Sequence, residues 1–372
     1  MVKSVRDAWH YPRQELARSY LKALDLGLQS ARGIFAKRRM GKTEFLNKDL
    51  IPAATKAGYL TAYANLWENR DNPAQALILA VALAVEPQGF EKFVRRFNPP
   101  IKKLKASGKV PGIGEAGLEA ELADPADVAG SALSDVMRRL DKTKKKLLLA
   151  IDEAQVLAAA DHANFTHALR AALDVRKATV KVIFAGSSEN TLRQMFARSS
   201  EPFYNWAPLE PFDLLGRDFV EDMVVKVNNL SKYPLTVTEA LKAFDALNQT
   251  PDFFRRFLDR YLTHAHLGVK AALEATKAQV FNNADFGNYW KTLLPADQEV
   301  LRMLAEGVQD LHGKVALKRL GKALGLEQPV SQNTPAHALK RLQYDTVVAR
   351  VDHGKYRFED DAFAQWVRGL DA

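Results

Sequence analysis

The pattern of apolar and polar residues divides the first 212 positions into strands and helices that alternate. Short continuous apolar runs are typical of buried parallel strands, and apolar residues spaced three or four apart indicate amphipathic helices. The pattern therefore predicts the α/β fold class, with a parallel sheet that has helices on both faces. The first predicted strand ends before residue 37, and the others cover residues 58–66, 146–153, 180–185 and 207–211.

The pattern changes at residue 213, after which the spacing is helical up to residue 288 and no run suggests a strand. This region is predicted to be all-α, with helices at 214–229, 236–248, 251–264 and 269–283. Residues 290–372 differ again, because helices at 295–308, 315–324 and 334–347 precede a hairpin and a last helix at 361–370. Three helices and a hairpin form the winged-helix arrangement. The predicted domains are residues 1–212, 213–289 and 290–372.

A specific motif follows the first predicted strand. It has the layout of a phosphate-binding P-loop, in which backbone N–H groups and a helix N-terminus surround the phosphates. Lys42 is placed to reach the β- and γ-phosphate oxygens, and the Thr43 hydroxyl is placed to ligate Mg²⁺. The predicted phosphate-binding residues are Ala36, Lys37, Arg38, Arg39, Met40, Gly41, Lys42, Thr43 and Glu44. Alanine occupies position 36, where the P-loop motif has its first glycine.

Polar residues also follow two further strands. One apolar run ends in Asp152 and Glu153, and another is followed by Ser187 and Ser188. Because ligands gather at the carboxyl ends of parallel strands, these side chains are expected to meet the P-loop. Asp152 would hold Mg²⁺, Glu153 would orient and deprotonate a water, and one of the serines would contact the γ-phosphate or that water.

Each of these motifs alone has an ordinary structural explanation. A Gly-Lys-Thr sequence occurs in turns by chance, and acidic or hydroxyl residues commonly end strands or cap helices. Their joint occurrence, in this order and each at a strand end, is what predicts a nucleotide site.

Arginines near the site are candidates for stabilising phosphate charge. Arg255 and Arg256 follow Thr250-Pro251 at the start of a predicted helix, and Arg255 is the one assigned to the site. Arg193 and Arg198 follow the active edge of the predicted sheet and are the candidates for an arginine that acts in trans. An ordinary surface role remains open for each of the four.

Charge is distributed unevenly along the chain. The net charge is +9, and residues 1–150 alone hold 26 Lys and Arg against 16 Asp and Glu. Residues 290–372 are almost neutral, with 12 basic against 11 acidic residues. The most basic stretch, residues 91–109, has seven cations and a single acid. It is either a solvated surface insertion or a contact for nucleic-acid phosphates.

Composition excludes several classes of protein. The absence of cysteine excludes disulfides and thiolate metal sites. The longest apolar run, Ala76 to Val85, is too short to span a bilayer, and charged residues near Met1 interrupt any signal sequence. We expect a cytoplasmic protein without a membrane partner.

Taken together, the P-loop, the run through Asp152-Glu153-Ala154-Gln155 and the sequence Phe184-Ala185-Gly186-Ser187-Ser188 resemble the AAA+/STAND class of P-loop ATPases. They resemble in particular the archaeal-type branch, whose P-loop commonly reads Gly-Pro-Arg-Arg-x-Gly-Lys-Thr. The resemblance covers essentially the whole chain. It implies an ATPase domain, a helical lid and a C-terminal winged helix, with ATP and Mg²⁺ as ligands.

The chain departs from that class at two places. The lid of the class bears a Gly-x-Pro element, of which Gln249-Thr250-Pro251 keeps the proline, and Ala36 replaces a P-loop glycine. Nucleotide binding is therefore expected, and the rate of turnover stays open.

Three functions are consistent with these features. The first is an ATP-dependent switch acting on DNA in replication, recombination or mobile-element biology, through residues 91–109 and the winged helix. The second is a signalling or defence switch whose winged helix binds a protein partner. The third is a nucleotide-binding scaffold with little turnover. A homo-oligomer stays open for any of the three functions.

Overall fold

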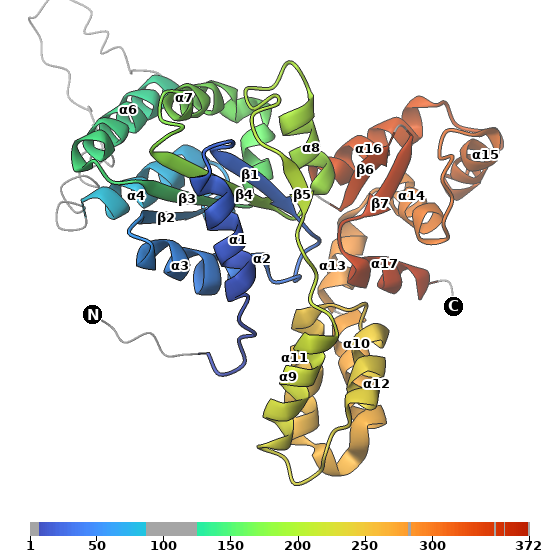
Figure 1. Cartoon of the computed structure of the whole chain (residues 1–372). Helices are drawn as coiled ribbons and strands as arrows, with labels where there is room; N and C mark the ends of the chain where they lie inside the picture. The colour runs from blue at the N-terminus through green and yellow to red at the C-terminus, as the bar shows by residue number, and fades with distance from the viewer. Residues whose placement is uncertain (1–6, 87–124, 282–283, 346, 353, 371–372) are drawn as a thin grey trace, which may run out of the picture.

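The computed structural model of the chain describes residues 7–86, 125–281, 284–345, 347–352 and 354–370 (Figure 1). The basic segment 91–109 lies outside these residues, so its predicted contact with nucleic acid stays a prediction. No helix in the described ranges combines the length and apolar character needed to cross a membrane.

A five-stranded sheet forms the centre of the first part of the chain. Its order is β2-β3-β4-β1-β5, and every neighbouring pair is parallel. Strand β4 therefore lies between β1 and β3, which places the ends of these three strands side by side. The strands are β1 (Ala31–Phe35), β2 (Leu60–Asn65), β3 (Leu147–Asp152), β4 (Val180–Gly186) and β5 (Leu209–Pro211).

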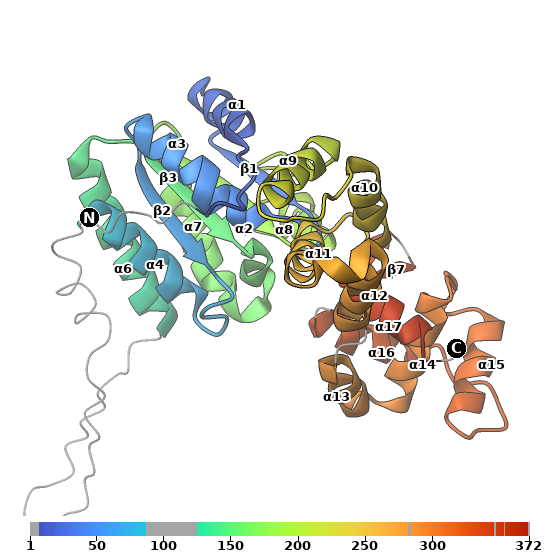
Figure 2. The ribbon, with the colours of Figure 1, turned by 90° about the horizontal axis from the view of Figure 1, so that it is seen from below.

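Helices cover both faces of this sheet (Figure 2). Successive side chains of a strand point to opposite faces, so Leu147 and Leu149 join one core while Leu148 and Ala150 join another. This double burial explains the continuous apolar run of β3. One face packs against α4 (Pro73–Val85), α6 (Pro125–Thr143), α7 (Ala163–Asp174) and α8 (Glu189–Ala197), and the other against α1 (Gln14–Asp25), α2 (Lys42–Phe45) and α3 (Ile51–Lys56).

The all-α region that follows has a core of its own. It contains α9 (Arg217–Asn228), α10 (Val237–Ala246), α11 (Pro251–Thr263) and α12 (Gly268–Phe281). Phe219, Phe244 and Phe254 pack together there, with ring centroids 5.2 to 5.8 Å apart. Trp9 and Tyr11, from the segment before α1, pack against the same core. This segment thus joins the helical lid to the sheet.

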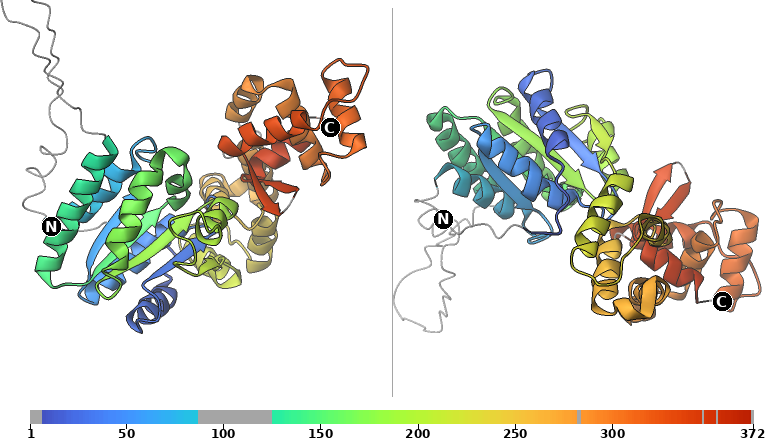
Figure 3. Two further views of the ribbon diagram at one scale, coloured as in Figure 1. Left: turned by 90° about the horizontal axis from the view of Figure 1, so that it is seen from above. Right: turned by 60° about the horizontal axis from the view of Figure 1, so that its bottom comes forward.

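The C-terminal part continues from the lid at the end of the molecule away from α6 (Figures 1 and 3). It contains α13 (Ala284–Thr292), α14 (Pro295–Ala305), α15 (Lys314–Ala323), α16 (Asn333–Tyr344), β6 (Val348–Asp352), β7 (Lys355–Phe358) and α17 (Asp361–Arg368). Helix α13 was not predicted as a separate helix, although helical spacing was expected up to residue 288. Its aromatic residues pack on α17, with Phe286 and Phe363 5.1 Å apart and Trp290 and Trp366 5.7 Å apart.

Candidate nucleotide-binding site

The loop between β1 and α2 has the backbone of a phosphate cradle. Arg39 and Gly41 have φ values of +68° and +89°, in the left-handed region that turns successive N–H groups toward one concave side. Glycine adopts this conformation freely, whereas Arg39 does so at a cost of about 1–2 kcal/mol. Ala36 is not among the residues with a positive φ. Alanine therefore fits the first position of the loop without strain.

Lys42 is the cation of this cradle. Only 5% of its surface is exposed, and its Nζ donates to the carbonyl oxygens of Ala36 at 2.6 Å and Lys37 at 3.0 Å. Burial lowers the pKa of Lys42, while the nearby carboxylates of Glu153 and Asp152 act in the opposite direction. A buried ammonium with carbonyl partners favours an anionic ligand, because charge-assisted hydrogen bonds are the stronger ones.

Thr43 and Asp152 face each other at the end of β3. The Thr43 hydroxyl donates to Asp152 Oδ2 at 2.6 Å, and the Tyr63 hydroxyl donates to the same oxygen at 3.0 Å. Burial raises the pKa of Asp152, and the bond from Thr43 opposes that shift. Mg²⁺ commonly takes one or two protein oxygens and completes its shell with phosphates and water. Thr43 and Asp152 offer two oxygens of that kind.

Glu153 is held in position by the neighbouring strand. Its Oε2 accepts hydrogen bonds from the Ser187 hydroxyl at 2.8 Å, from the Ser187 N–H at 3.4 Å and from the Gln155 amide. The Oε1 of Gln155 is buried and has no donor among the described residues, so it is able to accept from a water. A Cβ at Gly186 would lie 2.3 Å from that oxygen, which explains the glycine. The arrangement suits a base that orients a water.

The two serines after β4 have different surroundings. Ser187 contacts Glu153, as above, whereas the Ser188 side chain caps α8 by accepting from the Thr191 N–H at 3.4 Å. Because β4 lies between β1 and β3, Ser187 comes between the P-loop and the two carboxylates. The structure thus brings Lys42, Thr43, Asp152, Glu153 and Ser187 together, and gives Ser188 a separate role.

The lid closes one side of the site. A cavity of about 390 Å³ is lined by residues 38–44, Glu153 and, from the start of α11, Pro251, Asp252, Arg255 and Arg256. Arg255 pairs with Asp7 at 3.4 Å, while Arg256 pairs with Asp252 of its own helix at 3.0 Å. Asp7 also accepts from Lys48 at 2.8 Å, and this bond lowers the pKa of Asp7 to about 2. Arg255 therefore links the lid to the segment before α1.

The two arginines near α8 are not among the residues that line this cavity. Arg193 pairs with Glu189 at 2.8 Å and lies over the Phe35 ring at 5.1 Å, and Arg198 is an exposed residue that ends α8. Within this single chain, Arg193 and Arg198 therefore fit the ordinary surface role that the sequence analysis left open.

Comparisons were made at the level of sequence and of structure. No protein-family model and no curated protein sequence matches the chain. Solved structures do. A Walker-type ATPase of Pyrococcus abyssi matches with a TM-score of 0.58 at 19% identity, over 96% of this chain and 95% of the other. The Aeropyrum pernix ORC2 protein in its ADP form matches with a TM-score of 0.54 at 16% identity, over 96% and 92%.

The chain has the fold of an archaeal-type AAA+ ATPase. A third match, the Aeropyrum pernix ORC1 protein in complex with DNA, has a TM-score of 0.50 at 15% identity and covers 99% of this chain and 95% of the other. The predicted fold class, a P-loop parallel sheet followed by a helical lid, is confirmed.

Sequence reasoning missed three groups at this candidate site. Tyr63 is the partner of Asp152, and the strand order that brings β2 beside β3 is needed to place it there. Glu359, which follows β7, reaches the P-loop region from more than 300 positions away and has no sequence signal. Asp7, by contrast, belongs to the charged segment near the N-terminus, and its link to Arg255 requires the folded lid.

Proposed function

We propose that the protein binds ATP with Mg²⁺ and hydrolyses it, as a molecular switch that acts on DNA. The observation that carries this proposal is the convergence of Lys42, the Thr43–Asp152 pair and the Glu153–Ser187 pair at adjacent strand ends. The nucleotide supplies the γ-phosphoryl group, and Mg²⁺ neutralises the charge on its oxygens.

The residues of the chain would divide the work as follows. Lys42 and the N–H groups of residues 36–44 would hold the phosphates, and Thr43 with Asp152 would hold Mg²⁺. Glu153, fixed by Ser187 and Gln155, would orient a water and take its proton. Tyr63 keeps the Asp152 carboxylate oriented through its bond to Oδ2. Ser187 would also contact the γ-phosphate end of the site.

The lid would respond to the nucleotide. Arg255 and Arg256 line the same cavity as the P-loop, so a bound phosphate would attract the start of α11. Arg255 is our candidate for this contact. Its present partner is Asp7, which lies outside its helix and is also paired with Lys48, whereas Arg256 pairs with Asp252 of the same helix. Residues 213–289 would thus be a lid domain between an ATPase domain, 1–212, and a C-terminal domain, 290–372.

DNA is the proposed partner for two reasons. The excess of positive charge in residues 1–150 suits a phosphate backbone, and the ORC1 structure of similar fold is a DNA complex. We propose that α14, α15 and α16 with the β6–β7 hairpin act as a winged helix. Asn333, His337 and Lys340 are exposed on α16, whereas Arg341 is paired with Asp297 at 2.6 Å. The first three are the better candidates for a groove.

A second function is favoured by two observations. Arg357 of β7 pairs with Glu189 of α8 at 2.9 Å, so the hairpin is engaged within the protein. The C-terminal part is also almost neutral. Both features suit a signalling switch in which this part holds an inactive state or binds a protein partner. The cytoplasm remains the predicted compartment for either function.

The test is ATP hydrolysis by the purified protein, with and without double-stranded DNA, at low and at physiological salt. We expect stimulation by DNA that fades as salt rises, because phosphate contacts release counterions. The matched control is Glu153→Gln, which should lower the turnover by roughly 10²- to 10⁴-fold and keep nucleotide binding. Slow turnover without stimulation would favour the signalling switch, and no effect of Glu153→Gln would leave a nucleotide-binding scaffold.

A further inference from the structure

The C-terminal hairpin places an acidic residue beside the P-loop. Glu359 directly follows β7 and is only 6% exposed. Its backbone N–H donates to the carbonyl of Val347 at 2.9 Å, which fixes its position relative to β6. On either side, Arg357 pairs with Glu189 of α8 and Asp360 caps α17 through a bond of 2.8 Å from the Ala362 N–H. Glu359 is therefore held at a junction between the hairpin and the ATPase part.

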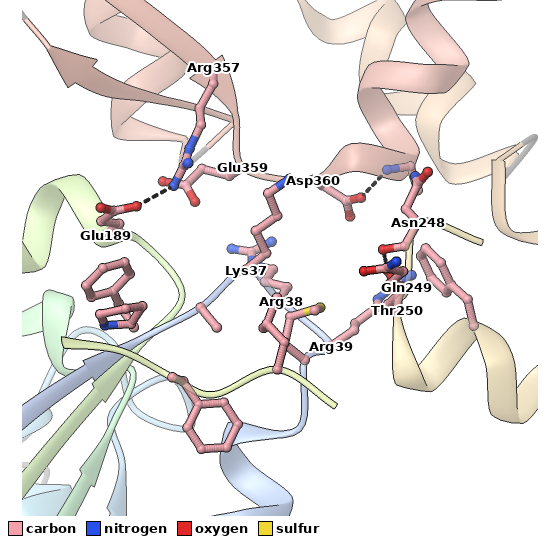
Figure 4. Close-up of a pocket in the computed structure, with 18 residues that line it drawn as sticks. Lys37, Arg38, Arg39, Glu189, Asn248, Gln249, Thr250, Arg357, Glu359 and Asp360 are labelled. Carbon is pink, nitrogen blue, oxygen red and sulfur yellow. Dashed lines mark hydrogen bonds and ion pairs between the residues drawn. The ribbon is translucent and has the colours of Figure 1, made fainter. Parts of the chain in front are cut away.

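This junction encloses a second cavity, which shares Arg38, Arg39 and Met40 with the first. The cavity has a volume of about 260 Å³ and is shared by three parts of the chain: residues 35–40 of the P-loop, residues 248–250 of the lid and residues 357–360 of the C-terminal part. In Figure 4, Glu189, Arg357 and Glu359 lie on one side of Lys37, and Asp360 and Asn248 to Thr250 lie on the other. Glu359 thus belongs to a surface that the hairpin completes.

The charges around Glu359 are those of the nucleotide site. Its carboxylate is hydrogen-bonded to Ser188, is attracted by Arg357 and Arg38, and is repelled by Glu153. Burial lowers the pKa of Lys42, and Glu359 opposes this shift together with Glu153 and Asp152. Burial raises the pKa of Glu359, which shows how poorly its negative charge is solvated there. Glu359 also lines one cavity with Ala36 and Lys37, whose carbonyl oxygens accept from the Lys42 ammonium. The hairpin consequently brings a carboxyl group to the part of the P-loop where the γ-phosphate would lie.

We infer that Glu359 makes the site favour nucleoside diphosphates over triphosphates while the hairpin is docked. This rests on the proposed function, because it assigns a specificity residue to the same nucleotide site. A γ-phosphate adds negative charge near Glu153 and Lys42, and like charges in a buried site repel strongly. Triphosphate binding and docking of Glu359 therefore oppose each other, and by linkage each weakens the other by the same factor.

The first experiment measures binding rather than turnover. Dissociation constants of ADP and of a non-hydrolysable ATP analogue, both with Mg²⁺, are determined by calorimetry for the full chain and for Glu359→Gln. This substitution keeps the shape of the side chain and removes its charge. We expect the preference for ADP to fall by about tenfold, within the usual range of coupling between sites, mainly through tighter binding of the analogue. The matched control is Glu327→Gln, an exposed carboxylate of the same part, which should leave the preference unchanged.

The second experiment needs no substitution and so remains decisive if Glu359→Gln does not fold. Amide hydrogen exchange of β6, β7 and the start of α8 is compared in the wild-type protein with ADP and with the ATP analogue. We expect the analogue to increase exchange there, as the hairpin leaves, and ADP to keep it low.

The outcomes separate the two proposals. Two results would overturn the role of Glu359 and leave the proposed function intact. In both, the protein binds both nucleotides: in the first, Glu359→Gln leaves the preference for ADP unchanged, and in the second, hydrogen exchange in the hairpin is equal with the two nucleotides. Binding of neither nucleotide overturns the proposed function as well.

Discussion

The two sides of the P-loop are built in different ways. On one side, Lys42, Thr43, Asp152, Glu153 and Ser187 come from the ends of three adjacent strands of one sheet. On the other side, the cavity beside Lys37 is completed by the lid and by the hairpin. The first set is as rigid as the sheet, whereas an interface between parts of a chain is able to come apart. The residues proposed for hydrolysis thus lie on the sheet, whose geometry is fixed, and the residue proposed for regulation lies at an interface whose geometry can change.

The backbone is strained on both sides, because Arg39 of the P-loop and Glu153 after β3 have positive φ values of +68° and +54°. The lid turn at the second cavity has two consecutive residues in the left-handed region, Asn248 at φ +58° and Gln249 at φ +51°. Gln249 occupies the position of the glycine in the Gly-x-Pro element, and a non-glycine residue there costs about 1–2 kcal/mol. Strain of this kind is characteristic of switch regions.

The largest effect is expected from Lys42→Ala. Removal of a charge-assisted contact to phosphate should weaken the binding of ADP and of the ATP analogue by about 100-fold or more, equivalent to ~2.7 kcal/mol. Calorimetry measures this loss, and hydrogen exchange of the hairpin without nucleotide should stay as in the wild type. Lys22→Ala, at an exposed lysine of α1, is the control. Tight binding of ATP by Lys42→Ala would falsify the assignment of the site.

The first side was accessible from the sequence because its signals are local. A strand, a loop with Gly41-Lys42-Thr43 and a helix follow each other directly, and Asp152 and Ser187 each end an apolar run. Parallel strands bring such ends to one edge, so their meeting could be predicted without the strand order. The choice of Ser187 over Ser188 could not, because it depends on where α8 begins and on which hydroxyl caps it.

The second side was not accessible, for a physical reason. Glu359 reaches the P-loop only after α17 packs on the lid core through Ala362 and β7 pairs with α8 through Arg357. Neither contact is indicated by a periodicity or a motif in the sequence. Each joins two surfaces that come from different parts of the chain and that have no distinctive sequence pattern of their own. Helix α13 was missed as a separate helix for a similar reason. Its aromatic residues pack on α17, a helix distant in the sequence, and form no core of their own.

Ser187→Ala and Ser188→Ala form a pair that sharpens the comparison, because the two residues are neighbours that face different sides. Loss of Ser187 removes a donor to Glu153 and should reduce the turnover by roughly tenfold or more, with little change in stability. Loss of Ser188 removes the cap of α8, and with it the hydrogen bond to Glu359, and should lower the free energy of unfolding by about 1 kcal/mol. Turnover assays and denaturant unfolding of both variants check this. A result with the two effects exchanged would contradict the separate roles of the serines.

The smallest effect is expected from the ion pair that holds the hairpin on α8. Arg357 and Glu189 are partly exposed, and Glu189 keeps Arg193 as a second partner, so Arg357→Ala should cost the docked state only about 0.2–1 kcal/mol. A double-mutant cycle with Arg357→Ala and Glu189→Gln, read by hydrogen exchange of β6 and β7, isolates this pair, and Arg193→Ala is the control. A coupling energy of zero would mean that the packing of α17 on the lid, through Ala362, is what docks the hairpin. In that case the lid itself, rather than α8, would transmit the repulsion between Glu359 and a γ-phosphate.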